Sequence, residues 1–272
     1  MTVGTSEFEY IRSFLQERSA IVLEDEKQYL VESRLQPLAR REGFATVAEL
    51  VTKLKSSRVN GLHQKVVEAM TTHETSFFRD IRPFEALRRV VLPERIAALG
   101  SIRRLRIWCM ACSTGQEPYS LAMLIREDFP QLQSWDVSIV ATDLSMQILE
   151  KARAGIFNQL EVNRGLPASC LVKYFQRQGI NWQVKDDIRK MIDFRPMNLI
   201  EPWPVVPSVD LILLRNVLIY FDVNSKKEIL GKVRTLLHRD GYLLLGGSES
   251  TFNLDDGFKR VELEKSSFYR LN

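Results

Sequence analysis

Three short apolar segments separated by helical patterns constrain the fold most strongly. Residues 105–110, 137–142 and 210–214 are largely apolar, and runs of about 4–8 such residues are typical of strands buried in a sheet. Helical patterns follow the first two runs, one ending near Asp128 and one covering residues 144–154. Strands that alternate with helices form a mostly parallel sheet covered on both faces. The sequence therefore predicts an α/β fold for the larger part of the chain.

The later part of the chain continues this alternation. A helix is predicted from Ser225, with Ser225 and Glu228 as its capping pair, to about His238, and an apolar strand follows at 242–245. Residues 258–271 alternate between apolar and polar side chains and turn near Glu264. A terminal antiparallel hairpin is therefore expected.

The first eighty residues carry a helical pattern instead. A second helix, over 26–41, is expected to bury Tyr29, Leu30 and Leu38 on its apolar side. Residues 46–49 form a capping-box signature at the start of a third helix, and a fourth is expected over 61–70.

This change of pattern defines the expected domains. The chain has 272 residues, 45% of them hydrophobic, which is enough for a small domain joined to a larger one. We expect a helical N-terminal domain over residues 1–75, a linker over 76–90 and an α/β domain over 91–272, with a small β-subdomain at about 176–194.

Composition excludes several classes of protein. No run of about 18 apolar residues is present, so no membrane-spanning helix is predicted, and the N-terminus does not resemble a secretory signal. Cys109 and Cys112 are spaced like a metal-binding or redox pair, but the sequence offers no second Cys or His pair at ligand spacing. We therefore expect a cytoplasmic protein with buried thiols and no metal site.

The charge pattern leaves two interpretations open. The net charge is only +4, and the N-terminal half lacks the basic excess of a surface that follows nucleic-acid phosphates. On the helix predicted over 26–41, Lys27, Arg34 and Arg41 recur every seven residues and form one stripe. Such a stripe is usually a solvated helix face, but it would also suit an acidic partner.

Small and polar residues follow the first two predicted strands. In an open α/β sheet, ligands bind beyond the carboxyl ends of the strands. Residues 111–120 contain Gly115 and other small residues that let the backbone approach a ligand closely. Glu117 could stabilise the start of a helix or pair with a ligand ammonium. Asp143 could accept hydrogen bonds from ribose hydroxyls or cap the next helix.

A third group follows the strand at 210–214. Arg215, Asn216 and Tyr220 come shortly after its end. We expect Asn216 or Tyr220 to face the site, whereas a surface turn would explain Arg215 alone.

Taken together, six segments resemble the CheR family of chemotaxis receptor methyltransferases. That family joins a helical N-terminal domain to a class I, Rossmann-like, S-adenosylmethionine-dependent methyltransferase domain. The resemblance covers nearly the whole chain. The segments occur in the family's order: 71–79, 111–120, 141–143, 198–199, 215–221 and 246–249.

The resemblance implies a role for each matching residue. Thr75 and Arg79 resemble the ligands of the methionine carboxylate, and Glu117 resembles the acid that holds the methionine ammonium. Asp143 is similar to the ribose-binding acid. The other implied cofactor contacts are Asn198 and Leu199 at the adenine, Asn216 close to the cofactor, and His73, which replaces the family's commoner Asn. Arg79 and Tyr220 are the implied catalytic residues beside the transferred methyl.

The resemblance also implies the reaction. Glutamate carboxylates on the cytoplasmic domain of chemoreceptors would receive the methyl, leaving S-adenosylhomocysteine, and Lys27, Arg34 and Arg41 would dock the receptor. Family members that bind a receptor's C-terminal pentapeptide carry an insertion that residues 176–185 lack, so the chain resembles the pentapeptide-independent subtype. We expect a monomer. A methyltransferase for another substrate and a non-catalytic cofactor-binding module remain alternatives.

Overall fold

The computed structural model describes residues 3–272, which form two compact units. The first contains residues 3–72 and 220–225, and the second contains residues 73–219 and 226–272. Each unit has its own apolar core. The first unit is entirely helical apart from one bridge between Ile21 and Phe221.

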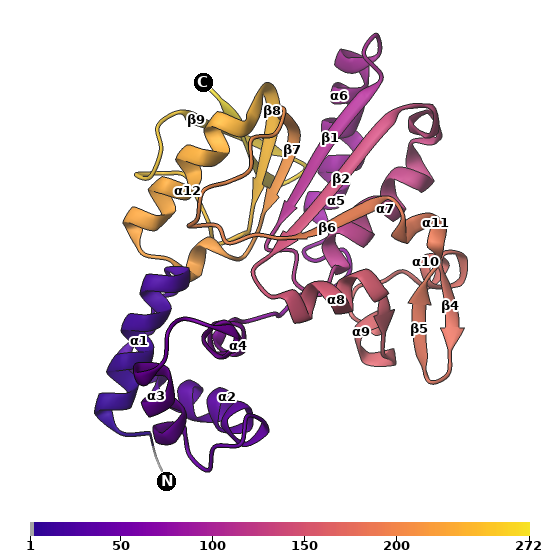
Figure 1. Cartoon of the computed structure of the whole chain (residues 1–272). Coiled ribbons are helices and arrows are strands. Elements are labelled where there is room, and N and C mark those ends of the chain that lie inside the picture. The colour runs from indigo at the N-terminus through magenta and orange to yellow at the C-terminus, as the bar shows by residue number, and fades with distance from the viewer. Residues whose placement is uncertain (1–2) are drawn as a thin grey trace. The chain divides into compact units, whose positions relative to one another are not determined.

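Four helices build the first unit: α1 (Thr5–Ser19), α2 (Gln28–Arg41), α3 (Val47–Ser56) and α4 (Gly61–Met70), with a 3₁₀ turn, η1 (Asp25–Lys27), before α2 (Figure 1). The hydroxyl of Thr46 caps α3 by accepting from the N–H of Glu49, as predicted. The Glu49 carboxylate accepts from Ala45, one residue earlier than a capping box would place it.

The apolar face of α2 differs from the prediction. Tyr29 is 61% exposed, whereas Val31, Leu35, Leu38 and Ala39 are buried. These buried positions recur at helical spacing, and Tyr29 lies outside their stripe. Leu38 was placed correctly and Tyr29 was not.

A seven-stranded sheet forms the centre of the second unit. Its order is β6-β2-β1-β7-β8-β10-β9. The first five strands are mutually parallel, and β10 is antiparallel to both of its neighbours. The strands are β1 (Arg104–Met110), β2 (Asp136–Asp143), β6 (Ile192–Pro196), β7 (Val209–Leu214), β8 (Leu237–Leu245), β9 (Phe258–Leu263) and β10 (Ser266–Leu271).

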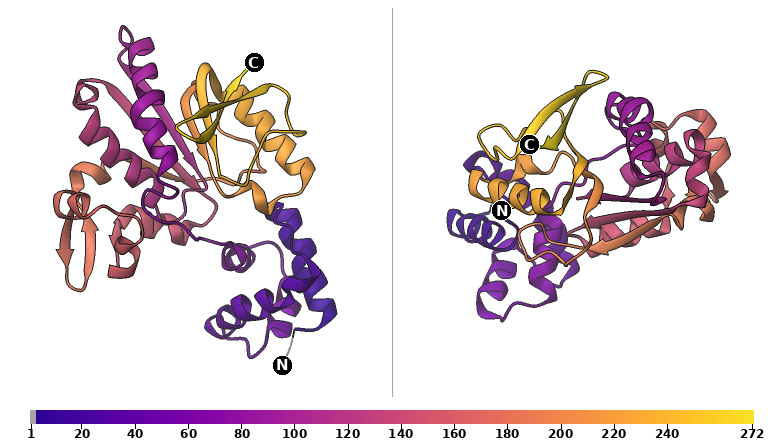
Figure 2. Two further views of the ribbon diagram at one scale, coloured as in Figure 1. Left: turned by 180° about the vertical axis from the view of Figure 1, so that it is seen from behind. Right: turned by 90° about the horizontal axis from the view of Figure 1, so that it is seen from above.

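Helices flank this sheet and confirm the α/β prediction (Figure 1). Seen from behind, residues 82–99 cross the sheet as one long helical segment (Figure 2). The helical elements are α5 (Arg82–Ala86), η2 (Leu87–Val91), α6 (Leu92–Leu99), α7 (Gln116–Asp128), η3 (Pro130–Ser134), α8 (Met146–Ala154), α9 (Gln159–Asn163), α10 (Ala168–Tyr174), α11 (Asp186–Arg189), η4 (Leu218–Tyr220) and α12 (Val223–Leu236).

Two local expectations need correction. Residues 76–90, expected to be a linker, are packed into the second unit, where Phe77, Phe84 and Leu87 are buried in the core. The helix α12 begins before Ser225, because Asp222 already accepts the N–H of Ser225 three residues later. Asp222, not Ser225, therefore occupies the capping position.

A small antiparallel sheet is also present, in the order β3-β5-β4. It combines β3 (Ile156–Phe157) with the hairpin of β4 (Phe175–Gln178) and β5 (Asn181–Val184). Gly179, with φ of +60°, begins the two-residue turn of the hairpin.

The strand order identifies where a ligand would bind. From β1 the chain moves outward to β2 and β6 on one side and then returns to β7 and β8 on the other. The carboxyl ends of β1, β2 and β7 therefore meet where the order reverses, which is the ligand-binding position of open α/β sheets.

Candidate functional site

The loop after β1 has an unusual backbone conformation. Ala111, Ser113 and Gly115 all have positive φ, at 52°, 51° and 92°. A Cβ on Gly115 would lie 3.1 Å from the Cβ of Ala152 and 3.2 Å from the ring of Tyr119. Position 115 therefore requires glycine both for its backbone conformation and for its surroundings.

Asp143 joins this loop to the end of β2. Its Oδ2 accepts the N–H of Ser113 at 2.8 Å, and its Oδ1 accepts the N–H of Ser145 at 3.1 Å. The cap of α8 is Ser145, whose hydroxyl accepts from Ile148. The N–H of Leu144 also hydrogen-bonds the carboxylate. A carboxylate has about four acceptor positions, so Asp143 can still accept from a ligand hydroxyl.

Burial raises the pKa of Asp143. The N–H groups of Ser145 and Ser113 and the nearby His73 oppose this effect because they favour the charged form. The net shift remains upward. Asp143 is thus an acid kept in a dry, hydrogen-bonded position at the strand end.

Glu117 lies in the first turn of α7 and forms a buried ion pair. Its Oε2 is 2.5 Å from Nη1 of Arg215, whose side chain is only 2% exposed. Nη2 of Arg215 also binds Asp80 at 2.9 Å and the carbonyl of Arg79 at 3.1 Å. The alternative of a surface turn therefore does not apply to Arg215.

Asn216, the next residue, has φ of +56°. Its side-chain Oδ1 is buried and has no hydrogen-bond partner among residues 3–272. A buried acceptor without a partner is rare, because its desolvation is uncompensated. The carboxylate of Glu249 holds the backbone of this loop.

The segment after residue 72 approaches the loop that follows β1. The carbonyl of His73 accepts the hydroxyl of Ser113 at 2.9 Å. Thr75 is half-buried, and Nη1 of Arg79 donates to the carbonyl of Glu74 at 3.0 Å. The structure therefore brings His73 to the same strand ends as Asp143.

Asn198 and Leu199 follow β6, beside β2. The N–H of Met197 donates to the carbonyl of Asp143 at 2.9 Å. Leu199 is buried, and the ammonium of Lys232 donates to the carbonyls of Leu199 and Ile200 at 3.3 and 3.0 Å. This segment is therefore fixed from α12.

Known protein families match the two parts of the chain. The family described as CheR methyltransferase, all-alpha domain, matches residues 6–71, and the family described as CheR methyltransferase, SAM binding domain, matches residues 73–267. The chain belongs to the CheR methyltransferase family.

Curated relatives of this CheR methyltransferase cover its whole length. The chain is 44% identical to chemotaxis protein methyltransferase 1 of Pseudomonas aeruginosa, over 99% of both chains. It is 40% identical to chemotaxis protein methyltransferase Cher2 of Pseudomonas putida, again over 99% of both. The protein is therefore an S-adenosylmethionine-dependent methyltransferase of chemotaxis, and the resemblance and fold class inferred from sequence are confirmed.

The donor and acceptor set of this CheR protein fits that cofactor. Asp143 can accept from a ribose hydroxyl, Oδ1 of Asn216 has no donor within residues 3–272, and Glu117 supplies negative charge at a helix start. These groups belong to neighbouring strand ends of one sheet. A nucleoside carrying a cationic amino acid matches this set of groups.

Tyr220 belongs to the other unit. It ends η4 (Leu218–Tyr220), and its carbonyl accepts the N–H of Val22 at 2.9 Å. The remaining sequence-predicted site residues lie in the second unit. Sequence reasoning gave no role to Asp80 or Glu249, although Glu249 closes one of the recognised segments.

The cations of the predicted stripe differ in their environments. Arg34 donates to the carbonyls of Met70 and Thr71 at 2.6 and 3.1 Å and to the hydroxyl of Thr72 at 3.0 Å. Lys27 lies in η1, before α2 begins. The side chain of Arg41 is 63% exposed, so Arg41 is the better-placed cation for an external partner.

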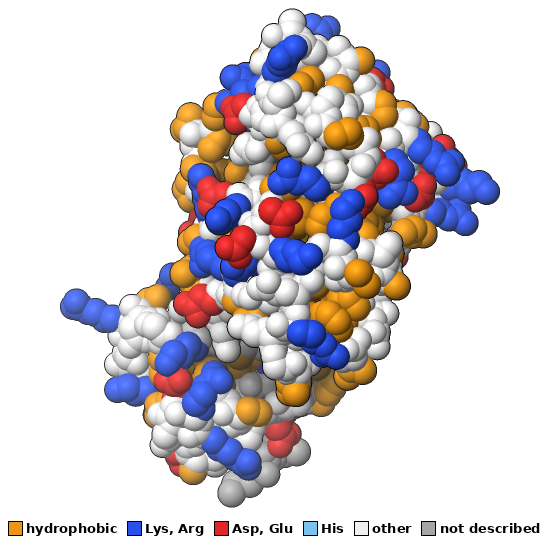
Figure 3. All heavy atoms as spheres, turned by 90° about the vertical axis from the view of Figure 1, so that its right-hand side faces the viewer, with side chains coloured by type: hydrophobic (Ala, Val, Ile, Leu, Met, Phe, Trp, Pro, Cys, Tyr) orange, Lys and Arg blue, Asp and Glu red, His pale blue; other side chains and the backbone are white. Residues whose placement is uncertain are grey.

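On the second unit, cations and carboxylates are intermixed over α7, α10 and α11 (Figure 3). Ion pairs account for this distribution: Lys173 with Glu127 at 2.7 Å, and Arg189 with Asp186 at 2.5 Å. Both pairs are surface pairs, which contribute little to stability.

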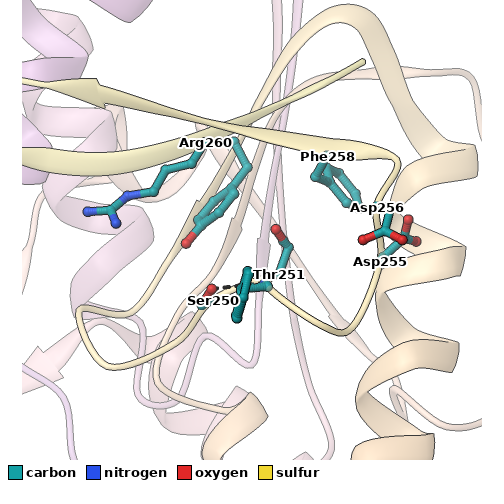
Figure 4. Close-up of a pocket in the computed structure, with 8 residues that line it drawn as sticks. Ser250, Thr251, Asp255, Asp256, Phe258 and Arg260 are labelled. Carbon is teal, nitrogen blue, oxygen red and sulfur yellow. Dashed lines mark hydrogen bonds between the residues drawn. The ribbon is translucent and has the colours of Figure 1, made fainter.

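Two cavities are present whose linings include none of the predicted site residues. One of about 500 Å³ adjoins the loop after β8 and the terminal hairpin (Figure 4). A smaller one of about 230 Å³ lies against β1 and β2. The first is lined by Ser250, Thr251, Phe252, Asp255, Asp256, Phe258, Arg260 and Tyr269.

Burial raises the pKa of the Cys109 and Cys112 thiols well above its ordinary value. Both are free and buried, as predicted, whereas Cys170 is half-exposed. Within residues 3–272 no three His, Cys, Asp or Glu side chains are grouped so as to hold a metal ion. Over the same residues, no helix has the length and apolar character needed to cross a membrane.

Proposed function

We propose that this CheR protein transfers the methyl group of S-adenosylmethionine to glutamate side chains in the cytoplasmic domain of bacterial chemoreceptors, the reaction of a protein-glutamate O-methyltransferase (EC 2.1.1.80). It would act in the cytoplasm as a monomer. The main support is the convergence of Glu117, Asp143 and Asn216 on adjoining strand ends, in a chain closely related over its full length to chemotaxis methyltransferases.

Three residues would hold the polar groups of the cofactor. Asp143 would accept from a ribose hydroxyl at the acceptor position that its backbone donors leave open. Glu117 would bind the methionine ammonium while Arg215 keeps the Glu117 carboxylate in place. Oδ1 of Asn216 would gain the donor that it lacks.

The remaining cofactor contacts come from two segments. His73, Thr75 and Arg79 would face the methionine carboxylate, with Arg79 supplying the positive charge. Asn198 and Leu199 would contact the adenine from the end of β6, where Lys232 holds their backbone.

The chemistry requires positioning more than proton transfer. S-adenosylmethionine supplies a sulfonium methyl that a carboxylate can attack directly. A substrate glutamate with a pKa near the reference value of about 4.3 is ionised at neutral pH, so no general base is needed. Arg79 would orient the substrate carboxylate and Tyr220 the reacting groups, since orientation can contribute roughly 7–11 kcal/mol.

The decisive experiment is transfer of radiolabelled methyl from S-adenosylmethionine to membranes that contain chemoreceptors. Wild type should deposit base-labile label, and Asp143→Ala should not. Asp193→Ala is the matched control, because Asp193 is an exposed acid paired with Arg195 on the neighbouring strand β6. Loss of label in both variants would remove the special role of Asp143.

Other outcomes separate the alternatives. Cofactor binding without label on a broad receptor panel would favour a non-catalytic cofactor-binding module, and label on another molecule would favour a different substrate. Arg79→Ala should lower turnover severely. Near wild-type turnover of Arg79→Ala at saturating cofactor would remove Arg79 from the site.

Receptor docking through Lys27, Arg34 and Arg41 is part of the proposal. Reversal of Arg41 to Glu should weaken receptor methylation at low salt, because Arg41 is exposed and surface attraction is screened by salt. Arg34→Glu is a poorer test, since it also breaks the contacts of Arg34 to Met70 and Thr72. Unchanged methylation by Arg41→Glu at low salt would contradict this docking face.

The compact hairpin of β4 and β5 supports action without a receptor pentapeptide. Its turn contains only Gly179 and Ile180 between the two strands. Removal of a receptor's C-terminal five residues should leave its methylation unchanged; a loss of methylation would contradict this subtype.

A further inference from the structure

Glu249 is a buried carboxylate that binds backbone instead of a side-chain cation. Its Oε2 accepts the N–H groups of Asn216 and Gly246 at 2.8 and 2.7 Å. Its Oε1 accepts those of Val217 and Ile219 at 2.8 and 3.3 Å. The residue is only 8% exposed. Four N–H donors from two loops therefore converge on one charged group.

The charge of this carboxylate matters as much as its shape. Hydrogen bonds to an ionised acceptor are roughly twice as strong as neutral ones. A glutamine would keep one oxygen but would direct its NH₂ group at backbone donors. The site therefore discriminates between glutamate and its closest isostere.

Gly246 makes the approach possible. A Cβ at position 246 would lie 2.7 Å from both Nδ2 of Asn216 and Oε2 of Glu249. Such a contact is well inside van der Waals distance, so Glu249 and Asn216 would have to shift to make room for it. Gly246 and Glu249 thus act together on the Asn216 side chain.

The loop held by Glu249 carries two residues of interest in the candidate site. Asn216 has φ of +56° and an unpartnered buried Oδ1, and Arg215, which precedes it, holds Glu117. A non-glycine residue in the left-handed region persists only where its surroundings fix it. Glu249 supplies that fixation through the N–H of Asn216 itself.

Glu249 is anchored from its other side. Its N–H donates to the carbonyl of Gly246 at 3.0 Å, and the hydroxyl of buried Tyr269 lies 3.5 Å from its carbonyl. The following segment, residues 250–257, leads into the terminal hairpin (Figure 4). The carboxylate therefore projects from a fixed backbone.

We propose that Glu249 is a positioning residue for cofactor binding: its carboxylate locks the loop after β7 so that Asn216 and Arg215 are presented in the binding conformation. This inference rests on the proposed cofactor site at these strand ends. It adds a residue that touches neither cofactor nor substrate and acts through the backbone.

Calorimetric titration with S-adenosylhomocysteine tests the inference directly. Glu249→Gln should weaken binding by about tenfold or more, with the folded protein retained. Glu249→Asp keeps the charge and should recover most of the affinity. Glu262→Gln, at an exposed position on β9, is the matched control and should bind like wild type.

A second variant covers the case in which Glu249→Gln does not fold. Gly246→Ala leaves the carboxylate in place but crowds it and Asn216, and it should weaken binding to a similar degree. A purely structural role would lower the melting temperature while folded protein kept its affinity. Affinity within about twofold of wild type in folded Glu249→Gln, or in folded Gly246→Ala, overturns the inference.

This titration is independent of the methyl acceptor. If wild type binds S-adenosylhomocysteine but labels no receptor, the proposed substrate is wrong, and the comparison of Glu249 variants still decides the positioning role. If wild type does not bind S-adenosylhomocysteine, both proposals fail.

Discussion

The strand β7 has a buried arginine–carboxylate pair at each end, and the two pairs serve different purposes. At its start, Asp210 binds Arg95 at 2.7 Å; just beyond its end, Arg215 binds Glu117 at 2.5 Å. Both arginine side chains are only 2% exposed. Residue types and burial alone therefore do not distinguish them.

The two pairs differ in how many of the carboxylate oxygens accept a hydrogen bond. Oδ1 of Asp210 binds Arg95 and Oδ2 accepts the N–H of Arg106 at 2.9 Å. Oε2 of Glu117 carries the ion pair, while its Oε1 accepts no hydrogen bond from the described residues 3–272. Both oxygens of Asp210 are therefore engaged, whereas Oε1 of Glu117 could accept a hydrogen bond from a ligand.

The largest effect on stability should follow from breaking the Arg95–Asp210 ion pair. Asp210→Ala leaves Arg95 buried and without its carboxylate partner, which should lower the free energy of unfolding by about 3–5 kcal/mol. Urea denaturation measures this loss. Affinity of the folded variant for S-adenosylhomocysteine should stay within about twofold of wild type; a large fall in affinity would erase the distinction between the two ends.

Glu117→Gln should show the opposite pattern. Removing the charge that would face the ligand ammonium in the proposed site should weaken S-adenosylhomocysteine binding by about tenfold or more. The loss of stability should be smaller than for Asp210→Ala, because Arg215 keeps its contact with Asp80. Paired calorimetry and urea denaturation measure both quantities. Unchanged affinity would show that Glu117 serves only the ion pair.

A change of pH should affect ligand binding at the candidate site through Asp143. Because burial raises the folded-state pKa of Asp143 above 3.8, its contribution to folding stability is present at low pH and is lost as pH rises through the raised pKa. Ligand binding has the opposite dependence, since the ionised carboxylate is the better acceptor.

Affinity for S-adenosylhomocysteine should therefore fall several-fold as pH is lowered from neutrality through the raised pKa of Asp143. Titration at a series of pH values measures this fall. Asp143→Asn should bind weakly at every pH with a flatter profile. A wild-type profile retained in Asp143→Asn would assign the dependence to another group.

Tyr220→Phe should give the smallest effect. It removes one hydroxyl and keeps the ring, and no proton transfer is required, so turnover should fall only a few-fold with cofactor affinity unchanged. Single-turnover methyl transfer measures this change. A complete loss of activity would require a chemical role for the hydroxyl.

Local patterns explain what could be predicted from the sequence. The strand ending at Asp143 and the small residues around Gly115 are features of consecutive residues, and the structure places both at the switch in strand order. Helix phase is less certain from sequence, because several faces can look apolar. Tyr29 shows this, since the core selected Val31 and Leu35 instead.

The contacts that complete the site could not be predicted in this way. Arg215 meets Asp80 across 135 residues and Glu117 across 98, and Glu249 meets Asn216 across 33. No periodic pattern links residues so far apart, and a polar residue after a strand can equally belong to a surface turn. Burial alone revealed that Arg215 and Glu249 are internal.

The dependence of the strand-end loops on late residues has a consequence for synthesis. Lys232 binds the backbone of Leu199, and Glu249 binds the backbone of Asn216. Because synthesis runs from the N-terminus, Lys232 and Glu249 emerge from the ribosome after the residues that they support. Earlier segments such as residues 111–143 can form local structure first, since chains fold as they emerge. With the proposed positioning role of Glu249, the nascent protein would gain full affinity for the cofactor only after Glu249 has emerged.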